Sequence, residues 1–300
     1  MRSDFLKYSP PSISTEETEE VVDTLSSHWI TTGPKTQAFQ SEFRDFVGAE
    51  AALALNSCTA ALHTALVALG VGPGDEVITT PMTFCASVNV IEHVGATPVL
   101  ADVEPDTLCI SPGRIAAAVT PRTKCILPVH YAGHPCDMDP IMELATDNKL
   151  YVVEDAAHSL PARYRGRTIG TIGDMTAFSF YATKNLTTAE GGMLTGSPEL
   201  IDEARIISLH GMSRDAWRRY EKGGSWYYEV VLPGFKYNMT DIQASIGLQQ
   251  LKKLNSFQDR RRAAVRHYND AFSQYPYFET PPQHPDVDHA WHLYALRLNL

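Results

Sequence analysis

The chain is organised around one stretch, Ser179-Phe180-Tyr181-Ala182-Thr183-Lys184-Asn185. It overlaps an apolar run that starts at Met175 and predicts a buried strand, so that Lys184 comes just after the strand. A lysine amine at such a position is costly to remove from water unless it has a partner or a covalent role. One such role is a Schiff base, because desolvation lowers the pKa of the amine and makes it nucleophilic. Taken alone, Lys184 is also compatible with a surface loop, and only the rest of the chain distinguishes the two.

Short apolar segments alternate with helical patterns up to about residue 195, which predicts an α/β fold with a mainly parallel, doubly wound sheet. The expected strands include residues 51–55, 76–80, 97–103, 123–130, 150–155 and 175–181. Right-handed crossovers put the carboxyl ends of parallel strands at one edge of the sheet. The residues that follow such ends, and that we therefore expect to converge, are the turn at 57–59, Phe84, Asp155 and Lys184.

The first of these strands ends in the turn Asn56-Ser57-Cys58-Thr59, and a helix begins at once. Free backbone N–H groups at a helix start, together with the helix dipole, make a site for an anion such as phosphate. The hydroxyls of Ser57 and Thr59 would add donors to this site. Read alone, the turn is also compatible with an ordinary helix cap.

A lysine, an acid and a phosphate turn at one sheet edge match the requirements of pyridoxal phosphate. Lys184 would form the Schiff base and, once released by a donor amine, would carry the proton between carbon atoms. Asp155 would keep the pyridine nitrogen protonated, which makes the ring an electron sink. Phe84, which is also compatible with a core position, would cover one face of the ring. The phosphate would be bound by Cys58, Thr59 and Ser179.

The chain resembles the DegT/DnrJ/EryC1/StrS family of sugar aminotransferases along nearly its whole length, from Trp29 to Tyr294. The motifs that carry the similarity are Ser57-Cys58-Thr59-Ala60-Ala61-Leu62, Glu154-Asp155-Ala156-Ala157-His158, the Lys184 stretch and Met239-Thr240-Asp241-Ile242-Gln243-Ala244. The resemblance implies a pyridoxal-phosphate-dependent transferase of fold type I, with the architecture of aspartate aminotransferase.

Roles for individual residues also follow from the resemblance. It implies Lys184 as the Schiff-base lysine, Asp155 at the pyridine nitrogen, and Ser179 and Thr59 at the phosphate. It adds His158 as a catalytic residue beside the cofactor, Asn238 as a further cofactor contact and Thr32 as a substrate contact. Family members usually form homodimers with shared active sites, and the loop at residues 234–239 would then reach into the partner's site. A cytoplasmic enzyme is expected.

The substrate is expected from a departure within that loop. Many family members read Gly-Tyr-Asn-Tyr-Arg where this chain has Gly234-Phe235-Lys236-Tyr237-Asn238. The exchange resembles the subgroup that acts on UDP-linked 4-keto sugars, and Lys236 would pair with substrate phosphates. The implied reaction moves an amino group from an amino acid, expected to be L-glutamate, to C4 of a keto-sugar nucleotide in amino-sugar or surface-polysaccharide biosynthesis. Two alternatives stay open: a cofactor-dependent keto-sugar dehydratase, in which histidine replaces the lysine, and a regulatory protein that binds the cofactor without turnover.

The C-terminal part predicts a change of domain. We expect a large cofactor-binding domain in residues 1–250 and the start of a small α/β domain, incomplete here, in residues 251–300, because family members run several dozen residues longer. A charged helix is expected at residues 248–272, with Arg260-Arg261-Arg262 on a solvated face. Alternation in residues 291–298 predicts a strand, and the polar stretch at 210–225 predicts an exposed loop.

Composition limits the classes of partner. The 300-residue chain has a formal net charge of −10, which disfavours nucleic acid as a partner. No apolar run approaches the roughly 20 residues that a membrane helix needs. The five cysteines are scattered and form no Cys-x-x-Cys pair, so we expect neither a metal site nor a disulfide framework.

Overall fold

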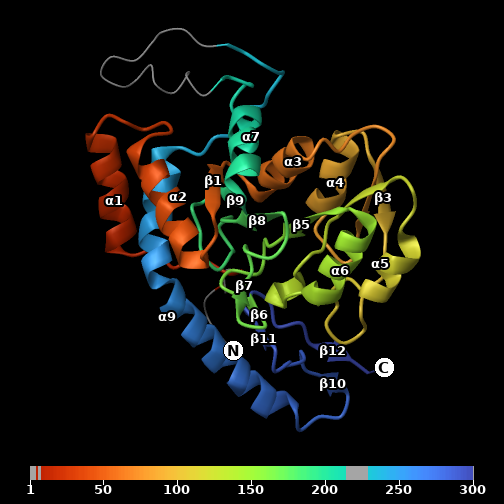
Figure 1. The fold of residues 1–300 in the computed structure, drawn as a ribbon. Coiled ribbons are helices and arrows are strands. Elements are labelled where there is room, and N and C mark those ends of the chain that lie inside the picture. The colour runs from red at the N-terminus through yellow and green to blue at the C-terminus, as the bar shows by residue number, and fades with distance from the viewer. Residues whose placement is uncertain (1–4, 6–7, 214–228, 300) are drawn as a thin grey trace.

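A seven-stranded sheet forms the centre of the molecule (Figure 1). The computed structural model describes residue 5 and residues 8–213 and 229–299. Across the sheet the strands follow the order β1 (Ala51–Leu55), β9 (Gly192–Gly196), β8 (Met175–Ser179), β5 (Tyr151–Asp155), β4 (Thr123–Ile126), β2 (Glu76–Thr79) and β3 (Thr97–Leu100). Strand β9 is antiparallel to both of its neighbours, and the pairs from β8 to β3 are all parallel. The predicted mainly parallel sheet is therefore confirmed.

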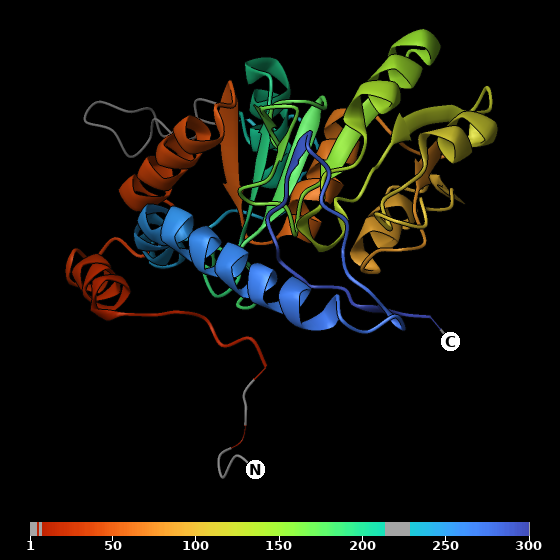
Figure 2. The ribbon, with the colours of Figure 1, turned by 90° about the horizontal axis from the view of Figure 1, so that it is seen from below.

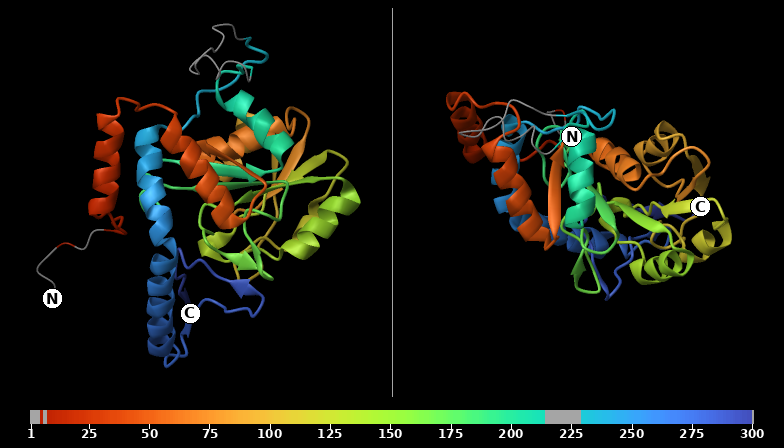
Figure 3. Two further views of the ribbon diagram at one scale, coloured as in Figure 1. Left: turned by 60° about the vertical axis from the view of Figure 1, so that its left-hand side comes forward. Right: turned by 45° about the horizontal axis from the view of Figure 1, so that its top comes forward.

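Helices cover both faces of this sheet (Figure 3). One face carries α3 (Cys58–Ala68), α4 (Ala86–His93) and α7 (Pro198–Ser208). The other carries α2 (Pro34–Val47), α5 (Pro112–Ala118) and α6 (Met138–Asn148). A short 3₁₀ turn, η1 (Tyr131–Gly133), follows β4. Each face has its own apolar core, so the sheet lies between two layers of helices.

Aromatic residues fasten α2 to the sheet. Phe39 and Phe43 are one helical turn apart and fully buried, as their spacing predicts. The Phe43 ring meets Phe178 of β8 edge to face at a centroid distance of 5.1 Å, and Phe39 meets Phe180 at 5.3 Å. Such pairs contribute about 0.5–1.5 kcal/mol each beyond the area they bury. These ring contacts therefore pack α2 against the strand that leads to Lys184.

A single helix, α9 (Asp241–Phe272), crosses the molecule beside α2 and α1 (Thr15–Ser26) (Figure 2). It begins at a capping box in which Thr240 Oγ1 accepts from the backbone N–H of Gln243 and Gln243 Oε1 accepts from that of Thr240. Ser14 caps α1 in the same way. Both caps have the Ser/Thr-x-x-Glu/Gln pattern that is typical of a helix start. The predicted domain division at residue 250 falls inside α9 and remains a prediction.

The C-terminal segment differs from expectation. Only Arg297–Leu298 of the predicted strand at 291–298 is extended in a sheet, as β12, which pairs with β10 (Phe278–Glu279). Trp291 instead has a φ of 52° and stacks on His289 at 3.8 Å. The strand predicted from the alternation of apolar residues was wrong for most of its length, because the His289 and Trp291 rings stack where the backbone turns at Trp291.

Smaller elements complete the described chain. Strands β6 (Arg163–Tyr164) and β7 (Arg167–Thr168) form a hairpin, and β11 (Val287–Asp288) pairs with β6. Most of the loop predicted at 210–225 lies outside the described residues. Among the helices that the structure describes, none has the length and apolar character that crossing a bilayer requires.

The start of α9 is joined to the start of α2 by the buried carboxylate of Asp241. Its Oδ1 accepts from Gly33 N at 2.8 Å, Thr36 N at 2.9 Å and Thr36 Oγ1 at 2.7 Å, and its Oδ2 accepts from Lys35 N at 3.1 Å. These N–H groups belong to the first turn of α2 and have no partner within the helix.

Replacing Asp241 by alanine should lower the free energy of unfolding by about 3 kcal/mol, because several buried donors lose their acceptor. Chemical denaturation of both proteins measures the difference. Asp259→Ala on the exposed side of α9 is the matched control and should change stability little. Equal losses in the two variants would show that the Asp241 contacts stabilise no more than a surface pair.

Candidate active site

A cavity of about 620 Å³ opens where the parallel strands end. Seven predicted site residues line it: Cys58, Thr59, Phe84, Asp155, His158, Ser179 and Lys184. They come from segments more than 100 residues apart in the sequence. The convergence predicted from the ends of the strands is thus observed. Tyr181, Glu190 and His292 add further walls.

One wall is the N-terminus of α3. Ser57 caps the helix, with its Oγ accepting from Ala60 N at 3.0 Å. Gly192 of β9 lies so close that a Cβ there would be 2.5 Å from the carbonyl carbon of Ser57 and 2.6 Å from Cys58 N. The exposed Thr59 and the first N–H groups of the helix line the cavity, where they could bind an anion.

The Cys58 side chain does not contribute to this anion site. Its thiol donates to the carbonyl oxygen of Ala177 at 3.6 Å. Burial raises the pKa of the Cys58 thiol well above its ordinary value, and the nearby Asp155 carboxylate adds to this. The thiol stays protonated, so only the backbone of Cys58 is available to a ligand.

Asp155 ends β5 and is 5% exposed. Its Oδ2 accepts from Ser87 Oγ at 2.7 Å and its Oδ1 from Ala157 N at 3.1 Å. Ser87 in turn lies 2.7 Å from Thr83 Oγ1. These bonds fix the direction of the carboxylate toward the cavity, while its remaining lone pairs are free to accept a proton donor of a ligand.

The residue before it, Glu154, holds this end of β5 in place. His130 Nδ1 accepts from Cys136 N at 3.0 Å, so the ring proton lies on Nε2, which donates to Glu154 Oε2 at 2.9 Å. Glu154 Oε1 also accepts from Gly173 N and Thr176 Oγ1, each at 2.8 Å. Burial alone would raise the pKa of Glu154, but these donors lower it below its ordinary value.

Lys184 lies in the turn after β8, with its backbone N–H bonded to Tyr181 O at 2.9 Å. Burial lowers the pKa of its amine, although the neighbouring Asp155 carboxylate favours the charged form. A larger fraction of neutral amine at a given pH follows, and the neutral amine is the nucleophile.

The rings of His158 and His292 stack on each other in the wall of the cavity, with their centroids 4.3 Å apart. Asn185 donates to the carbonyl oxygens of Leu160 and Ala290, so its Oδ1 accepts from His292 Nδ1 at 3.1 Å. Burial, with the Lys184 charge, lowers the pKa of His158 to about 3. Burial, then His158 and Lys184, lowers the pKa of His292 to about 2. Both rings are therefore neutral near pH 7, and His158 Nδ1 is buried without a hydrogen-bond partner among the residues that the structure describes.

Three predicted residues lie elsewhere. Thr32 and Asn238 line a separate cavity of about 140 Å³, where Asn238 Nδ2 donates to Thr32 Oγ1 at 2.7 Å. Lys236 is exposed beside Leu209 and does not line the 620 Å³ cavity. In their own chain these residues do not reach Lys184. Their roles remain proposals that require a second subunit.

Ser87 and His292 belong to the site although the sequence did not indicate them. Ser87 had no signal, because its bond to Asp155 joins residues 68 positions apart. His292 stood inside the segment predicted as a strand. The turn that replaces this strand brings the His292 ring onto His158.

Comparison with known proteins gives the family. The DegT/DnrJ/EryC1/StrS aminotransferase family model matches residues 11–300. The chain belongs to this family. It is 56% identical over 299 residues to the spore coat polysaccharide biosynthesis protein SpsC of Bacillus subtilis, covering 99% of this chain and 77% of SpsC.

Solved structures agree with this assignment. The putative sugar aminotransferase Spr1654 of Streptococcus pneumoniae, in its PMP form, superposes with a TM-score of 0.93 at 40% identity, over 98% of this chain and 79% of Spr1654. PseC of Helicobacter pylori, an aminotransferase of pseudoaminic acid biosynthesis, gives a TM-score of 0.90 at 30% identity, over 98% and 77%. The predictions of a fold type I transferase, of a sugar aminotransferase and of pyridoxal phosphate as its cofactor are confirmed at the level of the family.

The residues in the cavity fit pyridoxal phosphate. A desolvated amine, a carboxylate fixed at a strand end and a helix N-terminus occur in one cavity, which suits an aldehyde, a pyridine nitrogen and a phosphate. The close approach of Gly192 and the unpartnered His158 Nδ1 are further features of a site shaped for a ligand. We expect Lys184, Asp155, His158, Ser179, Cys58, Thr59 and Phe84 to hold it.

Lys184→Ala should remove the covalent link to the cofactor and lower turnover by on the order of 1,000-fold or more, since Lys184 is the one lysine among the described residues that line this cavity. Visible absorption and mass spectrometry after borohydride treatment report the link. Some cofactor should stay bound through its phosphate. Lys252→Ala, on the exposed side of α9, is the control and should behave like the wild type. Wild-type activity in Lys184→Ala would remove this lysine from the mechanism.

Asp155→Asn keeps the shape of the side chain but removes the charge that holds a proton on the pyridine nitrogen. We expect a rate loss on the order of 100-fold, or about 2.7 kcal/mol of transition-state stabilisation. Single-turnover kinetics measure it, and a melting temperature close to that of the wild type shows that the fold is retained. The exposed Asp102→Asn is the control. An unchanged rate in Asp155→Asn would mean that another group holds the proton.

Proposed function

We propose that this enzyme transfers an amino group from L-glutamate to C4 of a UDP-linked keto sugar, in the biosynthesis of amino sugars for a surface polysaccharide. The observation that carries the proposal is the partly desolvated Lys184 amine in the same 620 Å³ cavity as Asp155 and the start of α3. Bound pyridoxal phosphate supplies an electron sink when a proton leaves the carbon that carries nitrogen.

The protein's own groups have three tasks in this reaction. Lys184 Nζ, no longer bound to the cofactor, would take the proton from the amino-bearing carbon of the donor. It would deliver this proton to the carbon on the other side of the transferred nitrogen. The Asp155 carboxylate, oriented by Ser87, holds a proton on the pyridine nitrogen. His158, neutral near pH 7, offers its unpartnered Nδ1 as a hydrogen-bonding group that carries no charge into the cavity.

The acceptor is supported by the relatives and by one loop. SpsC is named for spore coat polysaccharide biosynthesis and PseC for pseudoaminic acid biosynthesis, and both products are carbohydrates. In this chain Lys236 stands where many family members have the asparagine of the Gly-Tyr-Asn-Tyr-Arg motif. Its side chain is exposed, so it is available to a substrate diphosphate. A UDP-linked 4-keto sugar is the acceptor that this exchange favours.

We further propose a homodimer with shared active sites. Phe84 lines the cavity and yet is 75% exposed in the single chain, so the cavity needs a cover. Thr32, Lys236 and Asn238 would contribute to the site of the second subunit. We place the enzyme in the cytoplasm, where the four buried free cysteines would stay reduced.

Two other functions are weaker. A dehydratase of this type needs histidine in place of the Schiff-base lysine, and this chain has Lys184. A regulatory protein would retain the cofactor without turnover, but it would have no need for a desolvated amine beside Asp155.

The decisive assay incubates the cofactor-loaded protein with L-glutamate and a UDP-linked 4-keto sugar. We expect release of 2-oxoglutarate in equal amount to a 4-amino sugar nucleotide, measured by a coupled assay and mass spectrometry. Lys184→Ala is the blank, and a 3-keto sugar nucleotide tests the position.

Each other outcome points to a different function. Amination of the 3-keto sugar alone would overturn the C4 assignment. A deoxygenated keto sugar without a new amino group, formed with release of 2-oxoglutarate and ammonia in equal amounts, would indicate the dehydratase. No turnover with several sugars and amino donors would favour the regulatory protein.

A further inference from the structure

A second cavity, of about 340 Å³, opens on the other side of Lys184. The two cavities share Thr183 and Lys184, so the lysine lies at their junction. The outer wall of the second cavity consists of residues 9–12, here called the N-terminal strap, and of α9 residues from Gln250 to Ala264.

The cavity is cationic. The charged residues among those lining it are Lys184, Arg260 and Arg261, and the described lining contains no carboxylate. This is unusual in a chain with a net charge of −10. Two adjacent guanidinium groups and an amine around a carboxylate-free hollow attract an anion.

The two arginines differ from their neighbour Arg262. Arg262 forms ion pairs with Asp288 at 2.6 Å and Asp259 at 3.4 Å. Within the described part of the chain, neither Arg260 nor Arg261 has a carboxylate within ion-pair distance. The prediction of a solvated face holds for the exposed Arg260 and was wrong for Arg261 and Arg262, which are partly buried. Burial and the charge of Arg260 lower the pKa of Arg261, so a bound anion would relieve a cost that the folded protein carries.

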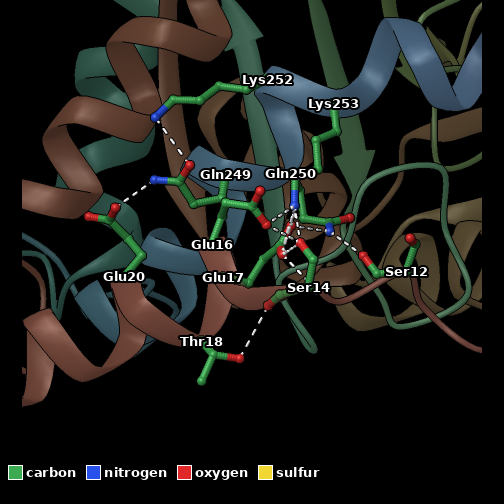
Figure 4. Close-up of polar contacts among 10 residues, drawn as sticks. All are labelled: Ser12, Ser14, Glu16, Glu17, Thr18, Glu20, Gln249, Gln250, Lys252 and Lys253. Carbon is green, nitrogen blue, oxygen red and sulfur yellow. Dashed lines mark hydrogen bonds and ion pairs between the residues drawn. The ribbon is translucent and has the colours of Figure 1, made fainter.

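The N-terminal strap, which forms part of the wall of this cavity, is hydrogen-bonded to α9. Gln250 Nε2 donates to the carbonyl oxygen of Ser12 at 2.8 Å and to Glu17 Oε1 at 2.7 Å (Figure 4). Lys253 Nζ binds both carboxylate oxygens of Glu17 at 2.9 Å, next to Ser14 (Figure 4). The acids nearest to the strap are therefore occupied by partners on α9 and do not neutralise Arg260 or Arg261.

We propose that Arg261, with Arg260, binds a carboxylate of the amino-acid donor in this cavity. The inference rests on the proposed function, because it places the donor beside Lys184. The donor must bring its amino-bearing carbon to the lysine, and its carboxylates lie only a few bonds from that carbon. Arginine suits this ligand, since its planar fork binds both carboxylate oxygens.

The size of the cavity favours the donor over the nucleotide. Small-molecule sites measure about 300–1,000 Å³, and this one lies at the lower end. A dicarboxylic amino acid fits such a space, whereas a sugar nucleotide needs the 620 Å³ cavity that also takes the cofactor. The two substrates then use separate anion sites that meet at Lys184.

The test measures binding by calorimetry with two probes, glutarate and UDP, on the cofactor-loaded full chain. Arg261→Gln should bind glutarate about 10- to 100-fold more weakly and UDP as the wild type does. Arg261→Lys keeps the charge but loses the fork, so it should give an intermediate loss. The control Arg266→Gln removes an exposed arginine from the same helix and should bind both probes normally. Melting temperatures identify any variant that is merely unfolded.

Several outcomes would overturn the inference. Weaker binding of UDP with unchanged binding of glutarate would assign the cavity to the nucleotide phosphates. If Arg261→Gln bound each probe as tightly as the wild type does, Arg260 and Arg261 would not have this role. The same would follow if the wild type did not bind glutarate. If glutarate binding depends on Arg261 while no keto sugar is aminated, the carboxylate site stands and the proposed acceptor falls.

Discussion

The buried contact between His130 and Glu154 is the constraint on which the site depends. A carboxylate with no exposure is stable only if donors replace the water it has lost, and Glu154 has three: the His130 ring, the Gly173 backbone and the Thr176 hydroxyl. These donors come from the segment after β4, the segment before β8 and β8 itself. These three contacts therefore set the relative positions of the strands that deliver Asp155 and Lys184.

Much of this arrangement could be predicted from the sequence, because it follows from the direction of the strands. Residues after the carboxyl ends of parallel strands must lie along one edge, and the 57–59 turn, Phe84, Asp155 and Lys184 do so. Local patterns are equally informative, because the Phe39 and Phe43 spacing and the caps at Ser14 and Thr240 each depend on residues within one helical turn.

The contacts that were missed are those between distant side chains. Ser87 reaches Asp155 only because α4 packs beside β5's end, and no local pattern reports such a pairing. Alternation at 291–298 indicated a strand, yet the His289 and Trp291 rings stack along a turn that carries His292 to His158. Arg261 was assigned to solvent because a charged triplet usually is, but it is partly buried beside a cavity that the N-terminal strap also lines. Thr32, Lys236 and Asn238 form no part of the cavity within one chain.

Helix α9 has a mechanical consequence. Its 32 residues span about 48 Å without interruption, so it behaves as a stiff beam and not as two hinged pieces. One end is clamped to α2 by Asp241, the middle presents Arg260 and Arg261 to a cavity, and the far end leads into β10 (Figure 2). It is also held farther along, by Lys253 to Glu17, by Arg262 to Asp288 and by Asn269 to Tyr294. A stiff helix held at both ends shifts as one body, so an anion drawn to its middle would move α2 and the C-terminal strands together.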